Sequence, residues 1–258
     1  MKNIYKKIII SFFLLIVILV SLLSGLFKDI LSFFSVILIH ELGHIIMSLI
    51  FKWNISEIDI GITGGFITYD ETIDKPFIEE LLIAAAGFIS QSIYFLLVFI
   101  LYKNNVIDYN FFFLIKKYYI GVLVFNLMPI MPLDASKILQ VILSMFFSYK
   151  KTLKLINLIS FINVFIIIFI FLFFKFKIEY SYIMIISFVI SFLIKNIKEI
   201  PHLFNKFLFE RYMYPLNVKK YEYIKGKNLN KLKRQRKHYF KINNHYYKER
   251  EILSKIFD

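Results

Sequence analysis

Long apolar stretches dominate the first two hundred residues of the chain and alternate with short polar connections. A helix that spans a bilayer needs about 20 consecutive, mostly apolar residues, and several stretches approach or exceed that length. The segments that we expect to cross a membrane are residues 8–27, 30–51, 77–101, 111–131, 155–174 and 179–194. The pattern therefore predicts an all-α integral membrane protein with about six transmembrane helices.

The first apolar segment follows Lys2, Lys6 and Lys7 and has the general layout of a secretory signal peptide. Its apolar run is longer than such peptides use, and no small-residue cleavage site follows it. We therefore expect a retained first helix. Because basic loops stay on the cytoplasmic side, the N-terminus is expected there, and six spans return the C-terminus to the same side.

The connection between the second and third apolar segments has a different pattern. Ile58, Ile60 and Ile62 alternate with polar or small residues, then Gly64-Gly65 follows and the alternation resumes. A period of two around a Gly-Gly pair is typical of a β-hairpin. We expect a small membrane-associated hairpin here, with an irregular interfacial loop as the alternative.

The chain becomes polar and basic from about Ile200 onward. Residues 195–258 hold 17 Lys and Arg against 6 Asp and Glu, which is much of the formal net charge of +14. We divide the chain into a six-span membrane domain, residues 1–200, and a basic cytoplasmic tail, residues 201–258. The tail is either a small α/β module or a partly disordered arm. Beside a membrane its basic run favours lipid or substrate as partner, and we expect no nucleic acid.

One short motif carries metal chemistry. The chain has no cysteine, so a metal would have to be held by His, Asp or Glu. His40-Glu41-Leu42-Gly43-His44 is an H-E-x-x-H motif, whose two histidines share a face when it is helical. Two such imidazoles can bind one zinc ion, with the glutamate beside the metal-bound water as general base. Zinc lowers the pKa of that water to about 7.

The position of the motif in the chain favours a functional role for its histidines over a purely structural one. It lies within the apolar segment 30–51, where ionisable groups are costly and usually functional. The other histidines, His202, His238 and His245, all lie in the tail. A purely structural histidine pair is the alternative interpretation.

A catalytic zinc site takes three protein ligands and keeps one position open. The candidate third ligand is Asp134, which ends the N-x-x-P-x-x-P-L-D run that begins at Asn126. Two prolines break the helix there, and irregular backbone at membrane depth is tolerated only beside protein or a watery cavity. The alternative is that Asp134 caps the helix predicted over residues 135–147. Lys137, one turn on, would pair with Asp134 when no metal is bound.

These two motifs together resemble those of the site-2 protease family of intramembrane zinc metalloproteases, over residues 8–200. The order of parts is similar to the branch of that family that acts in endospore formation. The resemblance implies one zinc ion per chain, held by His40, His44 and Asp134, with Glu41 as catalytic base. It also implies that Asn126 orients the substrate or the oxyanion.

The same resemblance implies an activity and partners. The chain would be an endopeptidase that cleaves a membrane-tethered protein near the cytoplasmic face, with a sigma-factor precursor as the implied substrate. It would lie in the bacterial cell membrane or a sporulation membrane, in contact with lipid and with an inhibitory or regulatory membrane protein. The tail would be a shortened CBS-like regulatory module. No oligomeric state is predicted.

Two stretches depart from the family pattern. Ala135-Ser136 follow Asp134 where the family often has Gly-Gly, and both are small enough to keep helices close. In the third apolar segment, Phe88 and Gln91 stand where the family often has Pro and Asn. The second departure concerns substrate contacts and leaves the metal ligands intact.

Two other functions fit part of the sequence. A non-catalytic metal-binding scaffold would tolerate loss of the metal motif, yet His40, Glu41, His44 and Asp134 are all present. A metal or proton transporter would need further acids in the last two apolar segments. Those segments offer only Glu179, at an end.

Overall fold

The computed structural model describes most of the chain. The described residues are 5–10, 19, 23–25, 27–61, 64–69, 74–173, 180–214, 216, 218, 220–243 and 245–257. The chain divides into two compact units. One comprises Met1–Thr72 with Ile78–Leu127, and the other comprises Ile73–Phe77 with Met128–Asp258.

Three apolar helices form most of the first unit: α2 (Phe27–Ile50), α3 (Phe77–Lys103) and α4 (Tyr109–Leu127). Helices α2 and α4 pack together, and a small core of Val36, Val98, Phe112 and Ile115 joins the three. Helix α4 ends before Pro129, and therefore earlier than the predicted span 111–131, because proline cannot donate a helical hydrogen bond and constrains the residue before it.

A three-stranded sheet completes the first unit, with β1 (Tyr5–Ile10), β2 (Ile55–Gly61) and β3 (Gly64–Tyr69) in that order. Strands β2 and β3 are antiparallel, so the predicted hairpin is present. Its turn is not at Gly64-Gly65, because both glycines pair with β2 and only residues 62–63 separate the strands. The association of this hairpin with a membrane stays a prediction.

The first strand corrects the start of the predicted first span. Residues 8–10 belong to β1, which runs parallel to β2, and not to a helix. Three consecutive β-branched isoleucines suit a strand that a neighbouring strand can pair with. The remainder of that predicted span falls largely outside the described residues.

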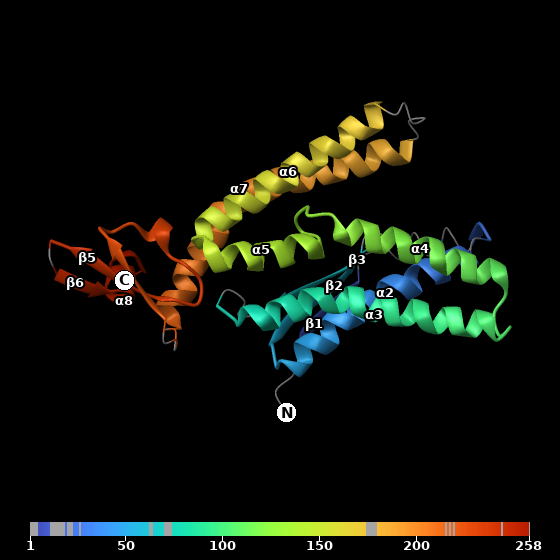
Figure 1. Cartoon of the computed structure of the whole chain (residues 1–258), viewed down its shortest axis with the longest axis horizontal. Helices are drawn as coiled ribbons and strands as arrows, with labels where there is room; N and C mark the ends of the chain where they lie inside the picture. Colours follow the sequence, from blue (N-terminus) through green and yellow to red (C-terminus); the bar gives the residue numbers. More distant parts are fainter. Residues whose placement is uncertain are drawn as a thin grey trace. The chain divides into compact units, whose positions relative to one another are not determined.

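The second unit begins with three helices, α5 (Asp134–Phe146), α6 (Tyr149–Phe173) and α7 (Tyr180–Met213). Helices α6 and α7 lie side by side as a long pair (Figure 1). Helix α7 continues through Pro201 to Met213, so the chain stays helical well beyond the last predicted span. Helix α5 is a separate, shorter helix that packs on α6.

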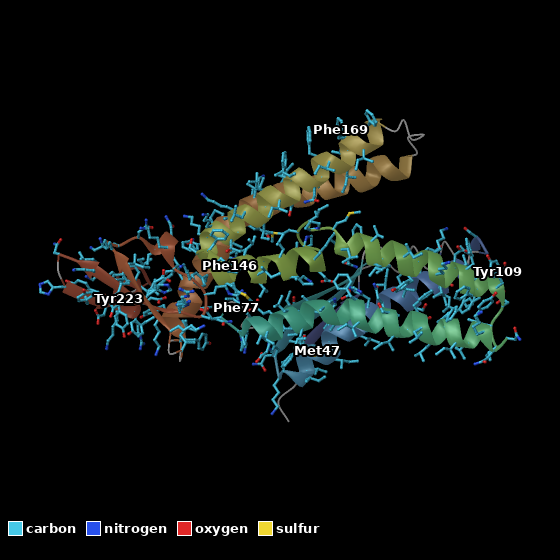
Figure 2. All side chains as sticks on the ribbon, in the orientation of Figure 1. Met47, Phe77, Tyr109, Phe146, Phe169 and Tyr223 are labelled. Atoms are coloured by element: carbon cyan, nitrogen blue, oxygen red, sulfur yellow. The ribbon has the colours of Figure 1, made fainter. Side chains whose placement is uncertain are left out.

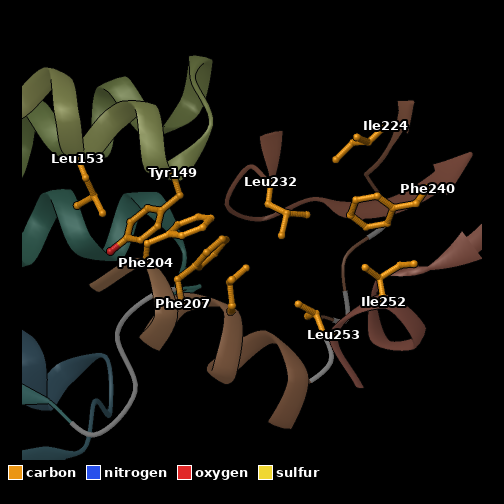
Figure 3. Close-up of a cluster of buried hydrophobic side chains, with 10 residues drawn as sticks. Tyr149, Leu153, Phe204, Phe207, Ile224, Leu232, Phe240, Ile252 and Leu253 are labelled. Atoms are coloured by element: carbon orange, nitrogen blue, oxygen red, sulfur yellow. The ribbon is translucent and has the colours of Figure 1, made fainter. Parts of the chain in front are cut away.

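The tail folds as a small α/β module, which resolves the alternative that the sequence left open. It contains β4 (Tyr221–Lys225), the 3₁₀ turn η1 (Leu229–Lys231), β5 (Lys237–Ile242), β6 (His245–Lys248) and α8 (Glu249–Phe257). Strand β5 is central, parallel to β4 and antiparallel to β6. Figure 3 shows Phe240 and Leu232 of this module facing Leu253 and, from α7, Phe207. This shared core attaches the module to the helix pair.

Four helices among the described residues are long and apolar enough to cross a membrane: Phe27–Ile50, Phe77–Lys103, Tyr109–Leu127 and Tyr149–Ile170. Their outward faces are apolar, and Figure 2 shows Tyr109 and Phe169 projecting from α4 and α6. Such continuous apolar exposure is expected where lipid covers a helix and not where water does. The chain is therefore a multi-pass membrane protein, and the number six stays a prediction.

Candidate metal centre

The H-E-x-x-H motif lies in the middle of α2, as predicted. His40 and His44 are four positions apart, so both project from one face of the helix. Both are buried, with 2% and 5% of their surfaces exposed. Their Nε2 atoms lie 3.2 Å apart, close enough for both to reach one small cation.

Helix α3 holds the other nitrogen of each ring. Nδ1 of His44 lies 2.7 Å from the carbonyl oxygen of Ile83, and Nδ1 of His40 lies 3.1 Å from Oε1 of Gln91. A carbonyl oxygen only accepts, so Nδ1 of His44 carries the hydrogen. In the neutral ring the lone pair is then on Nε2, the nitrogen that faces His40. With Oε1 of Gln91 as acceptor for Nδ1 of His40, Nε2 is in both rings the nitrogen that could bind a metal.

A glycine lets α3 approach the histidines this closely. A Cβ atom built on Gly87 would lie 2.5 Å from Nε2 of His44 and 2.7 Å from Nε2 of His40. Gly43 has the matching role on α2, where a Cβ would overlap Ser90 and the carbonyl of Ala86. The Oγ of Ser90 also donates to the carbonyl oxygen of Ile39. The two helices therefore pack backbone against backbone at the depth of the motif.

Asp134 is the first residue of α5 and is 4% exposed. The N-cap of this helix is Leu133, whose side chain makes no capping hydrogen bond, so Asp134 is the first helical residue and does not occupy the N-cap position that the alternative gave it. Oδ1 of Asp134 accepts a hydrogen bond from Nζ of Lys137 at 2.9 Å, which confirms the predicted pairing of Asp134 and Lys137.

His40, His44 and Asp134 form a group whose ligand atoms all lie within 4.8 Å of one another. All three residues are buried. Two imidazole nitrogens and one carboxylate oxygen are the donors of many catalytic zinc sites, and three protein ligands leave one position open. The residues present therefore fit a metal ion, and this group could hold one.

The two other predicted site residues lie on α2 and α4. Glu41 directly follows His40, is partly buried and takes part in further interactions. Asn126 lies in the last turn of α4, where its Nδ2 donates to the carbonyl oxygen of Val122 at 3.2 Å. Their catalytic roles stay predictions.

Sequence reasoning gave Gly87 no role at this centre and connected Gln91 with substrate contacts, not with the histidines. With Ile83 they stand at i, i+4 and i+8 on α3, one face of a helix. Gln91 is fully buried and lies between Ser90 and Ser92 in a mostly apolar helix. The signal available in the sequence was the amide of Gln91, one helical turn after Gly87.

No family model matches the chain. The chain is similar to the stage IV sporulation protein FB of Bacillus subtilis strain 168, with 28% identity over 206 residues. That similarity covers 80% of this chain and 71% of that protein. Among solved structures, the site-2 protease from Methanocaldococcus jannaschii matches with a TM-score of 0.54 and 24% sequence identity. The match covers 71% of this chain and 85% of that one, and it shows a shared fold.

Proposed function

The likeness in sequence and fold supports the assignment of this chain to the site-2 protease family of intramembrane metalloproteases, and on that premise we propose that it is a zinc-dependent intramembrane endopeptidase. Its substrate would be a membrane-tethered protein, cut near the cytoplasmic face. The similarity to a sporulation protein makes a membrane-associated sigma-factor precursor the candidate substrate, in the cell membrane or a sporulation membrane.

The observation that carries this proposal is the buried group of His40, His44 and Asp134 in a chain with four candidate membrane spans. We propose these three residues as the ligands of one zinc ion. Ionisable side chains at membrane depth are costly and are kept mostly for function. The ring orientations set by Ile83 and Gln91 bring both Nε2 atoms to one place, which supports a shared metal ion as their ligand.

Each residue has a role in peptide hydrolysis. Zinc, when bound, would polarise the scissile carbonyl and acidify a water molecule. The carboxylate of Glu41 would take the proton from the attacking water and give it to the departing amine. The amide of Asn126 would turn from Val122 to donate to the oxygen on which negative charge develops. The buried walls of α2 and α3 would exclude bulk water.

The domain organisation belongs to the same proposal. Residues 1–200 would form the six-span protease domain with both termini cytoplasmic, and residues 201–258 a regulatory tail. The strand order of the tail module, with β5 between β4 and β6, supports a compact module in place of an extended arm. A shortened CBS-like module is the form we propose.

The test combines metal content with proteolysis. Purified parent protein should contain about one zinc ion per chain. Asp134→Asn should lose that zinc, whereas Asp108→Asn, which changes an exposed acid at the start of α4, should retain it. The parent, reconstituted in liposomes with single-span membrane proteins of the same organism, should produce new N-termini within apolar segments, read by mass spectrometry.

Glu41→Gln separates a protease from a scaffold. It should retain zinc and lose at least 1,000-fold in cleavage rate, because the proton acceptor is missing. Equal cleavage by Glu41→Gln would remove Glu41 from the mechanism. Zinc bound equally well by Asp134→Asn would remove the third ligand. Zinc retained by the parent without any cleavage would favour the scaffold.

A further inference from the structure

We propose that Gln91 is a positioning residue, which holds the imidazole of His40 in the tautomer and orientation that bind the metal. This inference rests on the proposed function only in taking His40 as a ligand. Gln91 would touch neither metal nor substrate. It would act through His40.

The geometry places an acceptor behind the ligand ring. Oε1 of Gln91 lies 3.1 Å from Nδ1 of His40, and Gln91 has no exposed surface. A metal takes a ring nitrogen that carries no proton, so His40 can offer Nε2 only while Nδ1 holds the hydrogen. A hydrogen on a buried Nδ1 needs an acceptor, and Oε1 of Gln91 is that acceptor.

The two histidines are held by different kinds of group. His44 is held by a backbone carbonyl, that of Ile83, which every residue type at position 83 would supply. His40 is held by a side chain. The hydrogen bond at Nδ1 of His40 therefore depends on one replaceable residue, and a substitution at position 91 can remove it while leaving both ligands in place.

The rest of the Gln91 side chain argues against a purely structural role. Among the residues that the structure describes, its buried Nε2 has no hydrogen-bond partner. A buried donor without an acceptor weakens a fold. An apolar side chain of similar shape would remove that penalty, so packing alone favours another residue here. Glutamine at position 91 is explained by what its oxygen does for His40.

The experiment compares zinc affinity and the stability of the zinc-free protein in three variants. Gln91→Met keeps the volume and removes the acceptor. Gln91→Glu keeps an acceptor. Gln140→Met is the matched control, because it makes the same exchange at a partly buried glutamine of α5. Zinc affinity is measured by competition with a chelator, and stability as the thermal midpoint of the zinc-free protein in detergent.

We expect Gln91→Met to bind zinc about 10- to 100-fold more weakly than the parent, the usual effect of losing a group that orients a metal ligand. Its zinc-free form should unfold at the same temperature or higher, because the Nε2 of Gln91, unsatisfied among the described residues, is removed. Without metal, His40 can also carry its hydrogen on Nε2, 3.2 Å from Nε2 of His44. Gln140→Met should bind zinc within about threefold of the parent. Gln91→Glu should bind it as tightly as that or more tightly, because a carboxylate is the stronger acceptor. That combination would support the positioning role.

Two results would overturn the proposal. One is a Gln91→Met protein that binds zinc as tightly as the parent. The other is a Gln91→Met protein whose zinc-free form is clearly less stable, since weaker binding would then follow from a weaker fold. Failure of the proposed function would appear in the parent protein, as absence of zinc or of cleavage. The positioning role is judged separately, by the difference in zinc affinity between variants that contain the same three ligands.

Discussion

At the scale of single residues, the geometry of the candidate metal centre depends on the lack of a side chain at Gly87. Gly87 faces both histidines, and a methyl group there would lie within 2.7 Å of three of their ring atoms. Real Cβ atoms do not approach other atoms that closely, so either the rings or α3 would have to move. Because the interior is closely packed, a movement of a few tenths of an ångström spreads to neighbours.

Gly87→Ala should therefore weaken zinc binding at least tenfold. Helix propensity works in the opposite direction, because alanine is favoured over glycine by about 1 kcal/mol in a helix. The loss would thus come from the site alone. Gly121→Ala is the control, since a Cβ at position 121 of α4 meets nothing within 4 Å and should leave zinc affinity unchanged. Chelator competition measures the zinc affinity of both variants. Equal affinities would contradict the prediction, because they would show that α3 can shift to accommodate the methyl group without weakening the site.

At the scale of elements, ion pairs connect the first strand of the tail module to the segment just before its second strand, β5. Glu222 of β4 accepts from Nζ of Lys233 at 2.9 Å and from Nη1 of Arg236 at 3.1 Å. Partial burial alone would raise the pKa of the Glu222 carboxyl. The hydrogen bonds and charges of Lys233 and Arg236 outweigh it and hold that pKa below its ordinary value of 4.5.

This lowered pKa predicts how the module responds to acid. A carboxyl whose pKa is lower in the folded state stabilises it fully above pH 4.5, and the contribution disappears as the pH falls through the folded-state value. Glu222→Gln lacks that titration. Amide hydrogen exchange in β4 and β5 should therefore be faster in the variant than in the parent at pH 6, and the difference should shrink towards pH 3. A difference that is equal at both pH values would contradict the prediction.

At the scale of the whole molecule, one buried arginine connects three distant stretches of sequence within the second unit. The guanidinium of Arg211, at the end of α7, binds the carboxylates of Asp74 and Glu249 and the carbonyl oxygens of Lys233 and Arg236. Its side chain is 2% exposed. Asp74 belongs to this unit although its position in the sequence is far from the rest of it.

Arg211→Met should destabilise the second unit by about 3–5 kcal/mol, because Asp74 and Glu249 would be left without their shared cation. Hydrogen exchange should show faster opening of β5, of α8 and of the residues just before α3. Lys206→Met is the control on the same helix, since Nζ of the half-exposed Lys206 lies 3.8 Å from Oε1 of Glu210, and so long a pair should contribute less than about 1 kcal/mol. Similar exchange in both variants would show that the arginine network contributes no more than this single long pair.

The sequence by itself determined those features of this protein that depend on periodicity or on neighbouring residues. The spacing of His40 and His44 places them on one helix face, the apolar runs delimit α2, α3, α4 and α6, and the prolines after Asn126 end α4. Each of these follows from helix geometry or from backbone chemistry within a few residues. The metal motif could therefore be identified before any fold was known.

Tertiary structure decided which distant groups meet. Ile8, Ile9 and Ile10 suit a helix or a strand, and pairing with β2 settled the choice. Oε1 of Gln91 reaches His40 across 51 residues, and Arg211 reaches Asp74 across 137. No periodicity encodes such contacts, because they depend on how whole helices pack. The sequence thus identified which residues can bind a metal, and packing determined which nitrogen each histidine presents.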